Sequence, residues 1–131
     1  MEREPKRPTS RQIALACALA CDEKKAEDVA ILDVGKLTII CDYFVIATMM
    51  SERQAAAIAE DLRMKLKEKG VRMLGSDGLR EGRWAVLDFG AVVVHLFLGE
   101  LRRFYDLESL WAEAPGLRWK TPRPKRRKST K

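Results

Sequence analysis

Two short apolar runs constrain the fold of this 131-residue chain most strongly, because each is hydrophobic at successive positions. The first run is DVAILDV, residues 28–34, which is bounded by acidic residues and a glycine. The second is CDYFVIATMM, residues 41–50, which is rich in aromatic and β-branched side chains. Successive side chains of a strand point to opposite faces, so a strand that is apolar throughout is covered on both faces. The two runs therefore predict central strands of a sheet with a layer on each side.

Two helices are predicted on either side of these strands. Residues 9–25 show helical spacing of apolar side chains, and Thr9 or Ser10 is a suitable first cap. The stretch SERQAAAIAEDLRMKLKEKG predicts the second helix. It begins with Ser51 followed three residues later by Gln54, which is the pattern of a capping box, and it ends at a glycine.

The remaining elements are a short strand, a hairpin and a last helix. The sequence VRML predicts a strand at residues 71–74, ahead of a loop with three glycines. Residues 84–89 and 92–97 are predicted to form two strands joined through Gly90, with side chains that point alternately to the two faces. Residues 100–111 are predicted to form a helix. Helices thus alternate with strands before the hairpin. We predict an α/β or α+β domain with a mixed sheet of about five strands flanked by helices.

The positive charge of the chain is confined to its C-terminal end. Residues 112–131 hold eight lysines or arginines against Glu113, whereas the rest of the chain has a net charge of −1. The ending KTPRPKRRKSTK has little apolar content and two prolines, so it is not expected to fold. We therefore expect a flexible N-terminus at 1–8, one domain at 9–114 and a disordered basic tail at 115–131.

A basic tail attracts phosphates through the release of counterions, without reading a sequence. The sequence predicts a weak contact with RNA by this tail, against the alternative that it only improves solubility. The residues concerned are Arg123, Lys125, Arg126, Arg127 and Lys128.

Several features predict a cytoplasmic protein that does not enter a membrane. No apolar run approaches the roughly 20 residues that span a bilayer. The N-terminal sequence MEREPKRPTSRQ is polar and lacks the apolar region of a secretion signal. Three cysteines, an odd number, fit free thiols in a reducing compartment.

Two catalytic motifs are incomplete. The sequence DFG at residues 88–90 matches part of the protein kinase pattern, but the glycine-rich loop, strand lysine and catalytic loop are missing. Nucleotidyltransferases use Gly-Ser followed by Asp-x-Asp, whose two carboxylates hold two metal ions. Here Ser76 precedes Asp88, but Gly90 stands where the second carboxylate belongs. We therefore predict that the chain is not an enzyme.

The only histidine also has a simpler explanation than catalysis. Asp88 and His95 could meet across the hairpin as a proton-transfer pair, but no nucleophile lies near them in sequence. Cys17 and Cys21 lie four residues apart on a predicted helix and could bind a metal with His95. Their neighbours are alanines, so packing is the better explanation. We predict no metal and no cofactor.

In order along residues 28–111, several motifs form one recognisable pattern. They are the LDV strand, DYFVIAT before SERQ, a G-x-D-G loop, W-x-V-x-D-x-G, VVVH, and the ending E-x-R-R-x-Y-x-L-E-x-L-W. This pattern closely resembles the ribosomal silencing factor family, also called RsfS, Iojap or YbeB. The basic tail lies outside the shared pattern.

The resemblance implies a fold and a function. It implies a domain similar to the nucleotidyltransferase fold without its activity, often seen as a homodimer when free. It also implies binding to the large ribosomal subunit through ribosomal protein L14. Steric blocking of association with the small subunit would then repress translation when nutrients are limited. The alternatives are a nucleotide-transferring enzyme on the same fold and a factor for large-subunit biogenesis.

The resemblance and the hairpin pattern together indicate where a partner would bind. Tryptophan, tyrosine and arginine dominate the binding energy of many interfaces. We predict that the contact with ribosomal protein L14 is made by Trp84, Val86, Arg102, Phe104 and Tyr105. A structural role, or alternatively a partner contact, is predicted for Asp88, His95 and Gly78.

Overall fold

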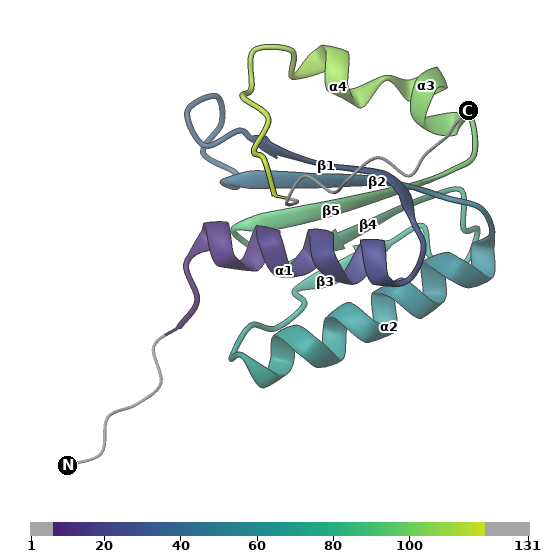
Figure 1. The fold of residues 1–131 in the computed structure, drawn as a ribbon, viewed down its shortest axis with the longest axis horizontal. Helices are drawn as coiled ribbons and strands as arrows, with labels where there is room; N and C mark the ends of the chain where they lie inside the picture. Colours follow the sequence, from purple (N-terminus) through teal and green to yellow (C-terminus); the bar gives the residue numbers. More distant parts are fainter. Residues whose placement is uncertain (1–6, 120–131) are drawn as a thin grey trace, which may run out of the picture.

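A five-stranded mixed sheet forms the middle layer of the protein in Figure 1, a computed structural model that describes residues 7–119. The strands are β1 (Glu27–Asp33), β2 (Tyr43–Met49), β3 (Gly75–Asp77), β4 (Trp84–Asp88) and β5 (Val92–Leu98). Their order across the sheet is β1-β2-β5-β4-β3. β2 and β5 are parallel, and the other neighbours are antiparallel. The mixed sheet predicted from the sequence is confirmed.

Helices cover both faces of the sheet, as Figure 1 shows. The two longer helices, α1 (Ser10–Glu23) and α2 (Glu52–Glu68), lie against one face. The two short helices, α3 (Leu101–Tyr105) and α4 (Leu107–Leu110), lie on the other. The predicted helix at 100–111 is thus interrupted at Asp106, whose φ of +47° lies in the left-handed region and ends the first helix.

Each face of the sheet has its own hydrophobic core. The core beneath α1 and α2 is the larger and includes Leu62 of α2 with Leu87 and Val94 of the hairpin, all fully buried. The core beneath α3 and α4 is smaller and is built around Phe44 and Phe97. Two cores explain why the central strands are apolar at successive positions.

The first turn of each long helix is fixed by side chains. At α1, Gln12 N donates to Thr9 Oγ1 (3.1 Å) and Thr9 N donates to Gln12 Oε1 (2.9 Å), which completes a capping box. At α2, Gln54 N donates to Ser51 Oγ (3.1 Å), as predicted. The reciprocal contact differs, because Gln54 Oε1 accepts from Met50 N (2.6 Å) rather than from the cap residue itself.

The strand predicted at 71–74 is wrong by several residues. Val71 N donates to the carbonyl of Leu66 (2.8 Å), so this residue lies in the turn that follows the end of α2. The strand instead lies at β3, within the glycine-containing loop, where exposed residues pair with β4. All three residues of β3 are exposed, so no pattern of buried side chains marks this edge strand in the sequence.

The domain extends past residue 114, where the sequence analysis ended it. Residues 115–119 run antiparallel to the outer edge of β1. Asp33 N donates to Pro115 O (2.8 Å), and Leu117 N donates to Ile31 O (2.9 Å). The indole Nε1 of Trp119 donates to Val29 O (3.1 Å). These bonds cover an otherwise open sheet edge, so the predicted tail begins at least five residues too early.

The three cysteines are buried as free thiols. Burial raises the pKa of Cys21 to about 12 and that of Cys41 to about 11, which keeps both as unreactive thiols at neutral pH. Within residues 7–119 no cluster of three or more histidine, cysteine or acidic side chains is placed to hold a metal ion. No helix in the same range has the length and apolarity needed to cross a membrane.

Candidate protein-binding surface

Three aromatic side chains form a partly exposed surface beside α3, which we call the aromatic surface: Trp84, Phe104 and Tyr105. Trp84 opens β4, and its ring lies 4.6 Å from that of Tyr105, centroid to centroid. Phe104 packs edge-on against Tyr105 at 5.2 Å. Phe104 is 77% exposed and Tyr105 45% exposed. The structure thus brings together three of the five residues predicted to bind a partner.

The aromatic surface is supported from below by buried rings. Trp84 lies opposite Phe97 in the β4–β5 ladder, and their ring centroids are 4.9 Å apart. Its indole Nε1 donates to Nδ1 of His95 (3.2 Å). His95 in turn packs edge-on against Phe44 at 4.8 Å. Trp84 is therefore held by packing and by a hydrogen bond before any partner binds.

His95 is a buried neutral side chain, 7% exposed. Because Nδ1 accepts the indole hydrogen bond, the ring proton lies on Nε2, which has no hydrogen-bond partner within residues 7–119. Burial lowers the pKa of His95 from 6.5 to about 4. The acceptor nitrogen of this neutral imidazole is occupied by the indole of Trp84, whose orientation it fixes.

The low pKa of His95 predicts an acid-dependent loss of stability. As pH falls from about 6.5 towards 4, the unfolded chain gains a proton that the folded chain does not, so the free energy of unfolding decreases. Proton NMR of the imidazole should give a pKa near 4, and the signal is unambiguous because the chain has one histidine.

Urea unfolding across the same pH range supplies the control. His95→Gln removes the titrating group, so the variant should lose less stability than the parent between pH 6.5 and 4. A measured pKa of 6 or above, or parallel pH curves for the two proteins, would show that His95 is not buried as described.

Asp88 and His95, the pair considered above and set aside, do not lie opposite each other. The β4–β5 register places Val86 opposite His95 and Val93 opposite Asp88. The carboxylate of Asp88 accepts from Gly90 N (2.8 Å) and so stabilises the hairpin turn. Val86 is half-buried on the same face of the sheet as Trp84, so it extends the aromatic surface along β4.

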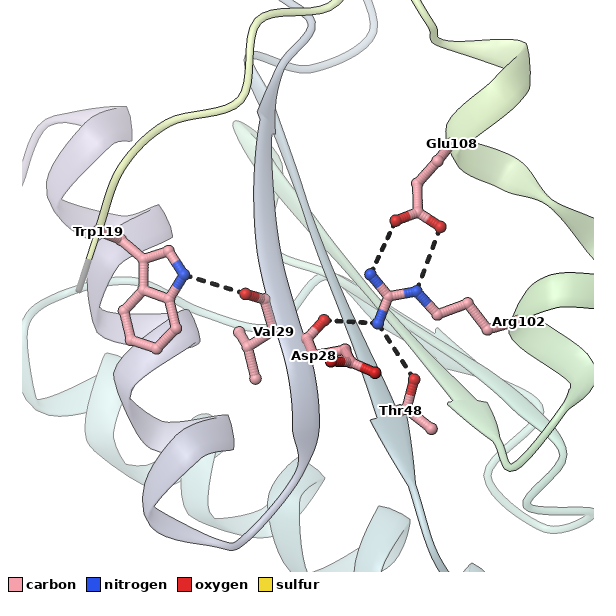
Figure 2. A network of polar contacts seen from close by, with 6 residues as sticks. All are labelled: Asp28, Val29, Thr48, Arg102, Glu108 and Trp119. Atoms are coloured by element: carbon pink, nitrogen blue, oxygen red, sulfur yellow. Dashed lines mark hydrogen bonds and ion pairs between the residues drawn. The ribbon is translucent and has the colours of Figure 1, made fainter. Parts of the chain in front are cut away.

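Arg102 lies at the centre of a polar network, as Figure 2 shows. Its Nε and Nη2 donate to the two carboxylate oxygens of Glu108 at 3.2 and 2.8 Å. Nη1 donates to the carbonyl of Asp28 and to Oγ1 of Thr48 (3.1 Å). The side chain is 14% exposed. Arg102 therefore ties α4 to β1 and β2, and its predicted contact with a partner stays a prediction.

Gly78 has a structural role in placing Trp84. Its φ is +78°, a conformation that side chains rarely adopt, and a Cβ atom there would lie 2.0 Å from the carbonyl oxygen of Trp84. The loop before β4 passes against the backbone of Trp84, and only glycine permits that approach.

Two further apolar residues had no predicted role. Ile39 and Ile40 are largely exposed in the connection between β1 and β2. The only signal in the sequence is a pair of adjacent isoleucines between two predicted strands. The predicted RNA contacts lie outside the described residues. They are Arg123, Lys125, Arg126, Arg127 and Lys128.

Comparison with known sequences supplies a family for this arrangement. A family model described as "Ribosomal silencing factor during starvation" matches residues 7–131. A ribosomal silencing factor of Bacillus subtilis (strain 168) is 39% identical over 105 residues, which cover 80% of this chain and 89% of that protein. The chloroplastic protein Iojap of Zea mays is 38% identical over 101 residues, covering 77% of this chain and 44% of that protein.

Two solved structures are similar in fold as well as sequence. A crystal structure of a Chromobacterium violaceum protein superposes with a TM-score of 0.77 at 38% identity, covering 80% of this chain and 88% of that one. A Bacillus halodurans protein superposes with a TM-score of 0.68 at 36% identity, covering 82% of this chain and 95% of that one.

Proposed function

This chain belongs to the ribosomal silencing factor family, and we propose that it represses translation by a steric mechanism. In this proposal it binds the large ribosomal subunit through ribosomal protein L14. The bound chain then blocks association with the small subunit when nutrients are limited. Such an activity belongs in the cytoplasm, where subunits join.

The aromatic surface is the observation that carries this proposal. An isolated exposed aromatic side chain is ordinary, but here a half-exposed Tyr105 packs against a fixed Trp84, and an exposed Phe104 packs edge-on against Tyr105. Aromatic residues on a rigid support are typical of the side chains that contribute most to protein interfaces. A sheet and two short helices hold this surface in place, so little ordering is required on binding.

We also propose that the chain acts without catalysis. The single carboxylate that matches a nucleotidyltransferase motif, Asp88, pairs with Gly75 in the sheet and caps the hairpin turn. Gly90 occupies the position of the second carboxylate, which two-metal chemistry requires. Asp88→Asn should therefore leave ribosome binding intact, whereas metal-dependent catalysis would be lost.

Sedimentation of purified ribosomal subunits tests the mechanism directly. Subunits are mixed at a magnesium concentration that favours joining, with and without the chain, and separated on a sucrose gradient. The chain should travel with the large subunit, and the joined particle should be depleted. If joined particles form normally while the chain stays at the top of the gradient, the proposal fails. Binding only to immature large subunits would instead favour a role in biogenesis.

Phe104→Ala tests the surface itself. We expect affinity for purified ribosomal protein L14, measured by calorimetry, to fall by about 2 kcal/mol, or roughly thirtyfold, because an exposed aromatic contact is removed. The fold should be unaffected, since Phe104 is mostly exposed. Met64→Ala on α2 is the matched control, because it shortens another exposed apolar side chain on the opposite layer. Equal affinities for both variants would place the contact elsewhere.

The basic C-terminal segment is proposed to contribute a weak contact with ribosomal RNA. The support for this contact is charge alone, because five of its lysines and arginines fall within residues 123–128. Replacing these five with glutamine should reduce the dependence of ribosome binding on salt concentration. An unchanged salt slope would assign all binding to the folded part of the chain.

A further inference from the structure

A polar pocket of about 690 Å³ lies where the start of β1 meets the end of β2, beside α3 and α4. Its walls carry five acidic side chains but only two basic ones, Arg102 and Arg103. The acidic residues are Glu27, Asp28, Glu100, Asp106 and Glu108. We call this site the acidic pocket. It shares no lining residue with the aromatic surface, although both draw residues from α3.

The pocket retains unpaired negative charge. The guanidinium of Arg102 is committed to Glu108, and Arg103 lies 3.9 Å from Glu100. In the part of the chain from residue 7 to residue 119, neither Glu27 nor Asp28 forms an ion pair. Two carboxylates at the start of β1 are therefore available to a cationic ligand.

The backbone at this point is also irregular. Asp28 has a φ of +50°, and the β1–β2 register shifts between Glu27 and Ala30. The carbonyl of Asp28 is held in this bulge by Arg102. Bulges are over-represented at sheet edges and next to active sites, where they redirect a side chain.

The last described residues run along β1 towards this pocket. Residues 115–119 run antiparallel to β1, so they pass its residues in descending order, from Asp33 to Ile31 to Val29. Figure 2 shows the two neighbouring residues of β1, Val29 bonded to Trp119 and Asp28 bonded to Arg102. The described chain thus ends at Trp119, which is bonded to the residue next to Asp28 in the wall of the acidic pocket.

The residues that follow Trp119 in the sequence have the complementary charge. Residues 120–131 contain seven lysines or arginines and no acidic residue. Twelve residues can span up to about 40 Å, which is ample to cross a pocket that begins one residue from Val29. We propose that this basic tail binds in the acidic pocket of its own chain.

This contact would regulate where the tail acts. Phosphates of RNA and the carboxylates of the pocket are alternative anionic partners for the same cations, so a tail held in the pocket is withheld from RNA. The inference does not depend on the proposed ribosomal function, because it concerns two parts of one chain.

A spin label on the tail tests the contact in the full-length protein. Ser129→Cys provides the attachment site, and the three native cysteines are buried and should not react. The nitroxide should remove most of the NMR intensity of amides at Glu100, Arg103 and Asp106, but not of Lys69 at the end of α2. The signals should recover at 1 M salt, where the screening length falls from about 10 Å to about 3 Å.

Variants that remove negative charges distinguish binding of the tail in the acidic pocket from its general attraction to an acidic protein surface. Glu27→Gln with Asp28→Asn removes two pocket charges, and asparagine tolerates the left-handed backbone of residue 28. This variant should restore the intensity of the pocket amides. Glu68→Gln with Glu81→Gln removes the same charge from exposed positions outside the acidic pocket and should leave the broadening unchanged.

Three results would overturn the proposal. The first is broadening spread evenly over the surface, and the second is broadening that the pocket variant does not reduce. The third comes from mixing spin-labelled chain with isotopically labelled chain that carries no spin label. Broadening of the pocket amides in that mixture would show that the tail binds another copy and not its own.

Discussion

Gly78→Ala is expected to lower the free energy of unfolding by about 3–4 kcal/mol. A left-handed conformation costs a side-chain-bearing residue about 1–2 kcal/mol. The added methyl group would also lie 2.0 Å from the carbonyl oxygen of Trp84, so the loop or the start of β4 must move. Forced displacement of packed atoms typically costs a further 1–3 kcal/mol or so. Urea unfolding followed by circular dichroism measures the loss.

Gly70→Ala is the matched control for this prediction. Gly70 has a similar φ of +86°, but nothing lies within 4 Å of a Cβ atom built there. This variant should therefore lose only the conformational part, about 1–2 kcal/mol. If the two alanine variants lose equal stability, the close approach between Gly78 and Trp84 contributes nothing, and the backbone conformation alone explains the glycine.

The elements of this fold were predictable where local chemistry decides them. The cap at Ser51 and the alternation in the hairpin each depend on residues a few positions apart. The register within the hairpin was not predicted, so the sequence alone left open a pair of Asp88 and His95, which the structure does not form. A shift of two residues along a strand keeps every side chain on its face, so the alternation could not exclude it.

The parts that were missed depend on contacts between distant residues. Trp119 bonds to a carbonyl 90 positions earlier, and this bond turns part of an apparent tail into a cover for β1. Arg102 likewise bonds to residues 54 and 74 positions away. No local pattern distinguishes a buried arginine from an exposed one on the same short helix. The aromatic surface was easier to predict, because Trp84 lies on the hairpin face and the motif at residues 100–111 spans Phe104 and Tyr105.

Arg102→Leu is expected to lower the free energy of unfolding by about 3 kcal/mol, because the network it holds joins α4 to β1 and β2. Removing one partner of a largely buried pair leaves the other groups unsatisfied, at a typical cost of about 3–5 kcal/mol. We take the lower value, because Glu108 is partly exposed. Arg103→Leu is the control, since this neighbouring side chain is 87% exposed and should lose almost nothing. A similar small loss for both variants would contradict the network.

The two roles considered for Arg102 can be separated by comparing it with Glu108. Glu108→Gln weakens the same network without changing the arginine that a partner would meet. If Arg102 acts on ribosomal protein L14 only by holding α3 and α4 in place, both variants should weaken binding in proportion to the stability that each loses. If the guanidinium also contacts the partner, Arg102→Leu should weaken binding much more than Glu108→Gln at equal loss of stability. Calorimetry and urea unfolding on both variants therefore test whether this arginine belongs to the fold, to the interface or to both.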